Sequence, residues 1–273
     1  MSLRSFLAAA GHGLSPRFDA LVQAEYAAQP LAPAAALQAA DLGHLPPPVR
    51  RYVLSSGAVG RPRPQRMTIA FDALMSKRAG ARPMVATSVQ HSFFGRSTRL
   101  FFMRARMAGL PVQVLHAYLR EEATMRVRVA SLVNVVDLAG EMLSRAETVT
   151  VLNDLCLMAP GALGDPHLAW TPRDERSAGV SFTNGRHRVA AVLSFNARDE
   201  LVDFASDDRP ALQGDGTLRP LRWSTPVDEY QVLDGLRLPS RARAVYAYPE
   251  GDHAYGIFTL RSVAFDQPAP RVG

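Results

Sequence analysis

Cysteine and lysine are almost absent from this chain. Cys156 is the only cysteine in 273 residues, so no disulfide can form within the chain and the fold does not depend on an oxidising compartment. Lys77 is the only lysine, and arginine supplies the remaining basic charge. Because the arginines are spread from Arg4 to Arg271 and do not cluster, the net charge of +6 does not indicate a nucleic-acid partner.

Long apolar runs are also missing. No run approaches the roughly 20 residues that a membrane-spanning helix needs, so no transmembrane segment is expected. The apolar segment that follows Arg4 is short for a secretory signal, and a charged, amphipathic segment comes directly after it. We therefore expect a soluble, bacterial-type protein in the cytoplasm, with the periplasm less favoured. Its 47% hydrophobic and 21% charged residues are typical of a globular chain with a sizeable core.

The familiar catalytic motifs are absent as well. The chain has no G-x-S-x-G, no phosphate-binding P-loop, no G-x-G-x-x-G and no H-E-x-x-H. Its histidines are dispersed without metal-ligand spacing; they are His12, His44, His91, His116, His167, His187 and His253. We expect no cofactor and no metal. Whether the chain is an enzyme stays open, and the missing motifs weigh against it.

Two regions of different texture follow one another along the chain. Residues 1–44 predict a helical arm, in which Ser15 and Pro16 suit the N-cap and first turn of a helix and a Pro/Ala-rich linker follows. The apolar stripe of this helix is Phe18, Leu21, Val22 and Tyr26. Residues 45–273 form the main predicted domain. It opens with a proline run and a short helix that turns Val49, Tyr52 and Val53 inward and ends near Gly57.

From about residue 66 the apolar pattern changes from a helical period to strict alternation. Arg104 and Arg106 alternate with Met103, Ala105 and Met107, which is typical of a strand with one wet and one covered face. Two more segments repeat this pattern, with Arg126 and Arg128 in one and Arg241 and Arg243 in the other. These arginines are interpreted as a solvated face. An arginine-lined site for an anionic ligand is the alternative.

Turn signals separate the predicted strands. Asn184-Gly185 supplies the positive φ of a type I′ hairpin, and Asp234-Gly235 marks a second hairpin. With roughly eight to eleven strands and helices only at the start and in the middle, the pattern predicts an α+β fold with a meandering antiparallel sheet.

A central apolar stretch carries polar residues where a plain core helix would have leucine or alanine. Within a helix predicted over about 145–160, Glu147, Thr150 and Asp154 form one polar stripe, with Asn153 and Cys156 beside it. A helix that is apolar almost all round is buried, so its polar groups must be paired or functional. They either tie the helix to a sheet arginine or loop backbone, or fix the head group of a ligand. A strand end at 148–151, which would dissolve the stripe, is the third interpretation.

A second concentration of charge lies at Ser206 to Arg209. Asp207 and Asp208 could bind a metal or share a proton, but adjacent side chains of an extended segment point to opposite sides, which favours separate partners. Trp223 is interpreted as a core or cavity-lining aromatic residue. The candidate ligand-binding residues are Glu147, Asn153, Asp154, Cys156, Asp207, Asp208, Arg209, Trp223 and Tyr230. No catalytic residue is assigned.

Five blocks occur together in a fixed order: LPPPVRRY, GLPVQVLHAY, ETVTVLNDLCLMAP, FASDDR and WSTPVDEYQVLDGLRLPS. In this order they resemble an uncharacterised bacterial family, over about Leu45 to Phe265. By analogy that family is similar to the LolA and LppX-type lipoprotein carriers. The resemblance implies an antiparallel sheet curled into a half-barrel, with helices plugging its concave apolar face, and it implies acyl chains or other hydrophobic molecules as ligands.

The sequence thus leads to three hypotheses about function. The favoured one is the binding of a hydrophobic or lipid-like small molecule on the concave face of the sheet. The second is a hydrolase or metal-dependent enzyme that uses Asp154 or the Asp207/Asp208 pair. The third is a structural or partner-binding module. The sequence does not indicate an oligomeric state.

Overall fold

The structure is a computed structural model that describes residues 13–76, 78, 80–130, 133–213 and 217–270. The short apolar segment after Arg4, which was weighed above as a secretory signal, lies outside these residues. Lys77 lies outside them too. Three α-helices are described: α2 (Leu14–Ala28), α3 (Pro47–Ser55) and α4 (Glu141–Met158). Two short 3-10 helices are η1 (Ala39–Leu42) and η2 (Pro160–Ala162).

Sixteen strands make up the rest of the regular structure in these residues. The six before α4 are β1 (Arg66–Met75), β2 (Met84–Phe93), β3 (Thr98–Met107), β4 (Leu110–Leu119), β5 (Glu122–Val129) and β6 (Val133–Ala139). Those after it begin with β7 (Leu168–Asp174), β8 (Ser177–Asn184), β9 (His187–Phe195), β10 (Leu201–Ser206), β11 (Ala211–Leu212) and β12 (Leu218–Arg219). The last four are β13 (Arg222–Ser224), β14 (Val227–Leu233), β15 (Leu236–Tyr248) and β16 (Gly251–Phe265).

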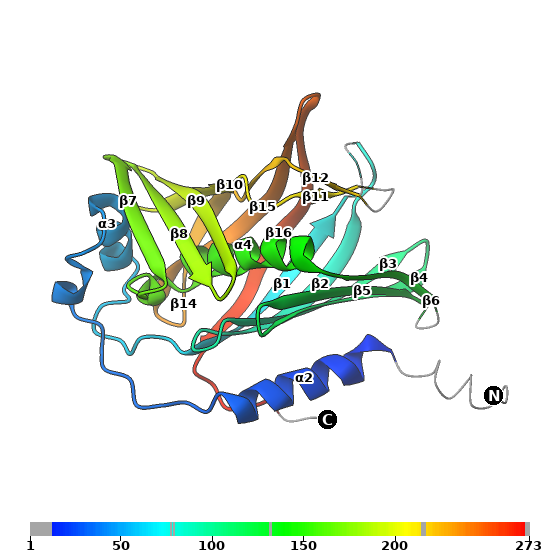
Figure 1. Cartoon of the computed structure of the whole chain (residues 1–273), viewed down its shortest axis with the longest axis horizontal. Helices are drawn as coiled ribbons and strands as arrows, with labels where there is room; N and C mark the ends of the chain where they lie inside the picture. Colours follow the sequence, from blue (N-terminus) through cyan, green and yellow to red (C-terminus); the bar gives the residue numbers. More distant parts are fainter. Residues whose placement is uncertain (1–12, 77, 79, 131–132, 214–216, 271–273) are drawn as a thin grey trace.

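Fourteen of these strands form one antiparallel sheet. Its order is β6-β5-β4-β3-β2-β1-β16-β15-β13-β10-β9-β8-β7, and β14 adds to β15. The last strand, β16, therefore pairs with the first, β1, and joins the N-terminal and C-terminal halves of the sheet. The sheet curls without closing, so β6 and β7 remain its two edges (Figure 1). This is the expected α+β half-barrel, with more strands than the eight to eleven predicted. Three of the additional strands, β11, β12 and β13, are only two or three residues long.

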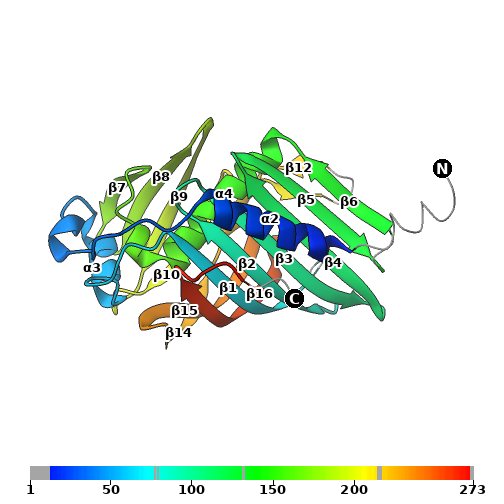
Figure 2. The ribbon, with the colours of Figure 1, turned by 90° about the horizontal axis from the view of Figure 1, so that it is seen from below.

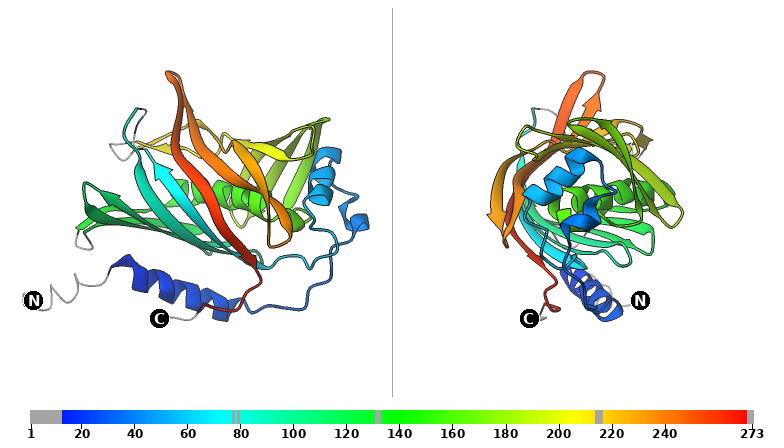
Figure 3. Two further views of the ribbon diagram at one scale, coloured as in Figure 1. Left: turned by 180° about the vertical axis from the view of Figure 1, so that it is seen from behind. Right: turned by 90° about the vertical axis from the view of Figure 1, so that its left-hand side faces the viewer.

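Helix α4 lies inside the curl of the sheet. Figure 3 shows the strands wrapping around it when the molecule is viewed from the end that carries α3. The helix is buried almost all round from Ser144 to Met158, as its apolar sequence predicts. It begins at Glu141, four residues before the predicted start, and the 148–151 segment is helical and not a strand end. The helix ends at Met158 because Pro160 restricts the residue before it.

Helix α2 covers the opposite, convex face of the sheet over β3 and β4 (Figure 2). It buries the predicted residues Phe18, Val22 and Tyr26. Their apolar partners on the sheet include Phe93, Leu100, Phe102 and Leu115. The prediction that Ser15 is the N-cap was wrong. The helix starts at Leu14 without a side-chain cap of its own, and the Leu14 amide instead donates to Gln113 Oε1 at 2.7 Å from β4.

The remaining local predictions concern α3 and the two hairpins. Val49, Tyr52 and Val53 of α3 are fully buried, and the helix stops before Gly57, whose φ is +80°. The predicted hairpins join β8 to β9 and β14 to β15, and these predictions and those for α3 are confirmed. Asp234 and Gly235 both have positive φ. In the β8–β9 turn only Gly185 has positive φ, and a type I′ turn needs it at both central residues, so the type I′ prediction for Asn184-Gly185 was wrong. In the part of the chain that the structure describes, no helix is long and apolar enough to span a membrane.

Candidate functional site

A cavity of about 780 Å³ lies between α4 and the concave face of the sheet. Its walls come from strands whose inward positions carry methionine, phenylalanine and valine, as strict alternation dictates. These apolar wall residues are Phe71, Met75, Phe101, Met103, Val114, Met125 and Phe258. Met142 and Leu143 from the first turn of α4 also line it. The volume falls within the roughly 300–1,000 Å³ of small-molecule sites, which are concave and mostly apolar.

Buried charged groups form one side of this apolar cavity, centred on Glu147 of α4. The Glu147 side chain is only 3% exposed. Its carboxylate lies 3.1 Å from Arg99 Nη1, 3.4 Å from His116 Nδ1 and 3.8 Å from Arg209 Nη2. Burial alone would raise the pKa of this carboxyl group, but His116, Arg99 and Arg209 together hold it well below its ordinary value. Glu147 is therefore ionised, and two guanidinium groups and one imidazole ring surround it.

Asp154 lies two turns further along the same face of α4. Its Oδ2 atom accepts hydrogen bonds from Arg99 Nε at 2.7 Å and from Gln90 Nε2 at 2.8 Å. Arg99 thus bridges Asp154 and Glu147, and fastens the helix to β3. This is the pairing with a sheet arginine that the sequence suggested. Asn153 is tied similarly, because its amide donates to Thr225 Oγ1 at 3.1 Å.

Arg209 enters the cavity from the segment that follows β10. Its Nε donates to Thr150 Oγ1 at 3.1 Å, and its Nη1 donates to the hydroxyl of Tyr246. The guanidinium also lies over the ring of Trp223, 4.7 Å from the ring centroid. A planar cation stacked on indole is held in one orientation. Arg209 and Arg99 therefore contact α4 from the two halves of the sheet.

The structure brings together five of the nine candidate residues. The cavity is lined by Glu147, Asn153, Asp154, Arg209 and Trp223. The other four lie elsewhere.

Cys156 is buried among core side chains, and burial raises the pKa of its thiol. The hydroxyl of Tyr230 donates to the Leu201 carbonyl outside the cavity. Asp208 pairs with Arg145, and Asp207 pairs with Arg222 on the surface, so the adjacent carboxylates do have separate partners. No group of three or more His, Cys, Asp or Glu side chains that could hold a metal occurs among the described residues.

Three residues of the candidate site were not predicted from the sequence: Arg99, His116 and Gln90. The signal for two of them was present. Arg99 has the same parity along β3 as the inward-facing Phe101 and Met103, and His116 has the same parity along β4 as Val114. A charged residue in phase with the apolar face of a strand indicates a buried polar contact.

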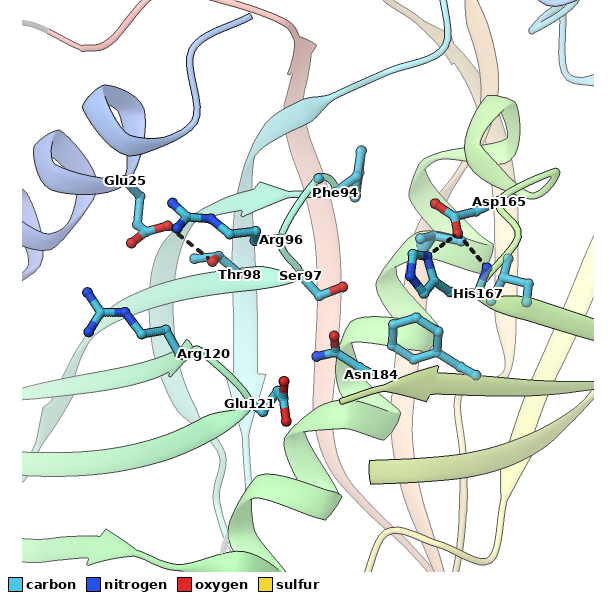
Figure 4. A pocket seen from close by; sticks show the side chains of 14 residues that line it. Glu25, Phe94, Arg96, Ser97, Thr98, Arg120, Glu121, Asp165, His167 and Asn184 are labelled. Carbon is cyan, nitrogen blue, oxygen red and sulfur yellow. Dashed lines mark hydrogen bonds and ion pairs between the residues drawn. The ribbon is translucent and has the colours of Figure 1, made fainter. Parts of the chain in front are cut away.

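A second, smaller hollow of about 310 Å³ lies beside Leu155 of α4 and the loop that follows the helix (Figure 4). It is bounded by α2, by the β2–β3, β4–β5 and β8–β9 turns, and by the loop after α4. Its charged side chains mostly have partners nearby: Glu25 accepts from Thr98 at 3.2 Å, and Asp165 contacts His167 at 2.8 Å. None of the nine candidate residues lines this hollow.

The fold and the larger cavity define this chain as an α+β half-barrel protein with a mainly apolar cavity on the concave face of its sheet. Residues 35–258 match DUF6544, a family of unknown function, and the chain belongs to that family. A comparison with curated proteins finds no match.

Solved structures similar to this chain include two proteins of low sequence identity. One is a DUF1329 family protein from Desulfovibrio piger, at 12% identity and a TM-score of 0.42, with 81% of this chain and 94% of the other covered. Another is a LolA superfamily protein from Nitrosomonas europaea, at 9% identity and a TM-score of 0.44, with 81% and 92% covered.

Proposed function

We propose that this protein binds a hydrophobic or lipid-like small molecule in the cavity between α4 and the concave face of the sheet. The observation that carries the proposal is the cavity itself. Its volume of about 780 Å³ is not filled by side chains, and Phe71, Phe101, Met103 and Phe258 are among its walls. Protein interiors are otherwise close-packed, so a space of this size lined by apolar groups favours an apolar occupant.

Flexible methionines at several points of the wall support the same proposal. Met75, Met103, Met125 and Met142 all line the cavity. A methionine side chain adapts to irregular shapes because it is unbranched and its sulfur is polarisable. Such a wall suits a ligand with a flexible chain. The paired charges at α4 then provide one polar side against which the ligand's polar end can lie.

Filling the cavity tests the proposal. Val114 lines the cavity from β4, whereas Thr87 is an exposed residue of similar size on β2. The wild-type protein should bind the neutral fluorescent probe N-phenyl-1-naphthylamine saturably and with 1:1 stoichiometry. Val114→Trp should weaken that binding at least about tenfold, since a tenfold change corresponds to about 1.4 kcal/mol. The control Thr87→Trp should bind like the wild type.

Either of two results would overturn the proposal. Either a wild-type protein that shows no saturable binding, or a folded Val114→Trp protein that binds the probe as well as the Thr87→Trp control, removes the cavity as the binding site. Native mass spectrometry of gently purified protein adds a second readout. Under the proposal it reveals a co-purified hydrophobic molecule that is lost in Val114→Trp.

A further inference from the structure

The charges that line the cavity differ in depth. Among the described residues they come from seven side chains: Arg99, His116, Glu141, Glu147, Asp154, Arg209 and His253. Glu141 is exposed at the first turn of α4, and His253 is only partly buried. The deeper groups are Arg99, Arg209, Glu147, Asp154 and His116, whose side chains are 9%, 14%, 3%, 19% and 17% exposed.

The two arginines and the two carboxylates of this deep group compensate one another. Arg99 contacts both carboxylates, at 3.1 Å from Glu147 and 2.7 Å from Asp154, and Arg209 contacts Glu147 at 3.8 Å. Two guanidinium groups face two carboxylates, so the deep part of the cavity has no net charge when His116 is neutral. An ionised ligand would add an uncompensated charge to a buried site, and such a charge is costly unless it finds a partner.

The carboxylate of Asp154 keeps one oxygen atom for a ligand. Both hydrogen bonds to Asp154 are made at Oδ2, by Arg99 and Gln90. Its Oδ1 atom accepts no hydrogen bond from the part of the chain that the structure describes, and Asp154 lines the cavity. An ionised carboxylate oxygen only accepts hydrogen bonds. The ligand group that meets it must therefore donate.

We infer that the ligand presents an uncharged hydrogen-bond donor, a hydroxyl or an amide N–H, to Asp154, with its apolar chain along the Met- and Phe-lined wall. This inference rests on the proposed function and specifies its ligand class. A carboxylate at the same place would face the acceptor Oδ1 and add a negative charge. An ammonium group could donate to Oδ1, but it would add a positive charge beside Arg99.

Displacement of N-phenyl-1-naphthylamine by amphiphiles with the same chain tests the inference. The series is 1-dodecanol, its methyl ether, dodecanoate and dodecylamine, at about pH 8. Dodecanol should displace the probe from the wild-type protein at a concentration about tenfold below that of either ion. The methyl ether is uncharged but has no donor, so it should be weaker than dodecanol.

These amphiphiles differ in water solubility. The differences cancel when the ratio of two affinities is compared between protein variants. Asp154→Asn removes one negative charge with little change of shape, so the affinity of dodecanoate relative to dodecanol should rise about tenfold or more. Arg209→Gln removes one positive charge, so the affinity of dodecylamine relative to dodecanol should also rise about tenfold or more. Asp207→Asn is the matched control, because Asp207 is an exposed surface residue, and its ratios should equal those of the wild type.

The outcomes separate this inference from the proposed function. Failure of the probe itself to bind overturns the proposed function and this inference with it. Probe binding in which dodecanoate matches or exceeds dodecanol, or in which the ratios are unchanged in both folded charge variants, overturns the uncharged-donor inference alone. Lower affinity for all amphiphiles with constant ratios assigns Asp154 a structural role and also contradicts the inference.

Discussion

Glu147 holds together groups from β3, β4 and the segment after β10. Arg99 belongs to β3, His116 to β4, and Arg209 follows β10, while Glu147 itself lies on α4. Removing one partner of a buried ion pair is strongly destabilising because the remaining charges lose their compensation. The surface pair of Asp207 with Arg222 is different, since water screens it.

Substitution of Glu147 should therefore have a large effect on stability. Glu147→Ala is expected to lower the free energy of unfolding by about 3–5 kcal/mol, because Arg209 loses the carboxylate that it contacts and Arg99 keeps only Asp154. The control Asp207→Ala should change it by less than about 1 kcal/mol. Urea unfolding followed by circular dichroism measures both. A Glu147→Ala protein as stable as the Asp207→Ala control would contradict the role assigned to the network.

His91 is a second buried titratable residue, on the convex face beneath α2. Its side chain is 5% exposed, and its Nδ1 lies 3.0 Å from Thr68 Oγ1 and 3.3 Å from the Tyr26 hydroxyl. Burial disfavours the charged imidazolium and lowers the pKa of His91 from 6.5 to about 4. Folding therefore favours the neutral ring.

The low pKa of His91 predicts loss of stability in mild acid. Between pH 6.5 and pH 4 the unfolded chain binds a proton that the folded chain does not, so stability is full above this window and falls as the pH drops. Urea unfolding should give a free energy about 2 kcal/mol lower at pH 5 than at pH 7.5 from this residue. In His91→Gln, which keeps a hydrogen-bonding group but cannot titrate here, that part of the difference should disappear. An unchanged pH dependence would refute the assignment.

At the scale of elements, α2 covers part of the convex face of the sheet. Phe18, Val22 and Tyr26 pack on β-strand residues such as Phe102, and the rings of Phe18 and Phe102 stack with centroids 5.2 Å apart. The apolar stripe of this helix was readable from its period. Its docking place was not, because a stripe identifies a buried face and not the surface that it meets.

Docking of α2 through Phe18 can be measured directly. Phe18→Ala should lower the free energy of unfolding by about 3–5 kcal/mol, the usual range for a buried phenylalanine that leaves a cavity. Leu31→Ala is a suitable control, because Leu31 is an apolar residue that is 42% exposed. It should cost less than about 1 kcal/mol. Equal effects of the two substitutions would show that α2 does not pack as described.

The candidate site illustrates which parts of a site a sequence can predict. The polar stripe of α4, with Glu147 and Asp154, followed from helical spacing alone. Local patterns could not place Arg209 rather than Asp207 inside the cavity, because both belong to one short segment and its path is set by contacts with Tyr246 and Trp223. Adjacent residues diverge in an extended chain, and only the tertiary structure decides which of them faces inward.

At the scale of the whole molecule, the two halves of the sheet also touch at a second place, apart from the β1–β16 pairing. The β4–β5 turn touches the β8–β9 turn, where His187 Nε2 lies 3.1 Å from the Glu121 carbonyl. Tyr118 of β4 makes the central contact. Its hydroxyl accepts from Asn184 Nδ2 at 2.7 Å and lies 2.9 Å from Thr148 Oγ1 of α4. One phenol thus joins the first half, the second half and the central helix.

Tyr118→Phe should loosen this junction without opening a cavity. Loss of the hydroxyl leaves the Asn184 amide without its partner and is expected to lower the free energy of unfolding by about 1–3 kcal/mol. Hydrogen exchange should quicken at residues 119–123 and 183–188 before it changes in β1 and β16, because local openings follow the weakened contact. Tyr248→Phe is the control, since the Tyr248 hydroxyl makes no hydrogen bond within the described residues, and it should alter neither measurement. Exchange that quickens evenly over the whole sheet would contradict a local junction at Tyr118.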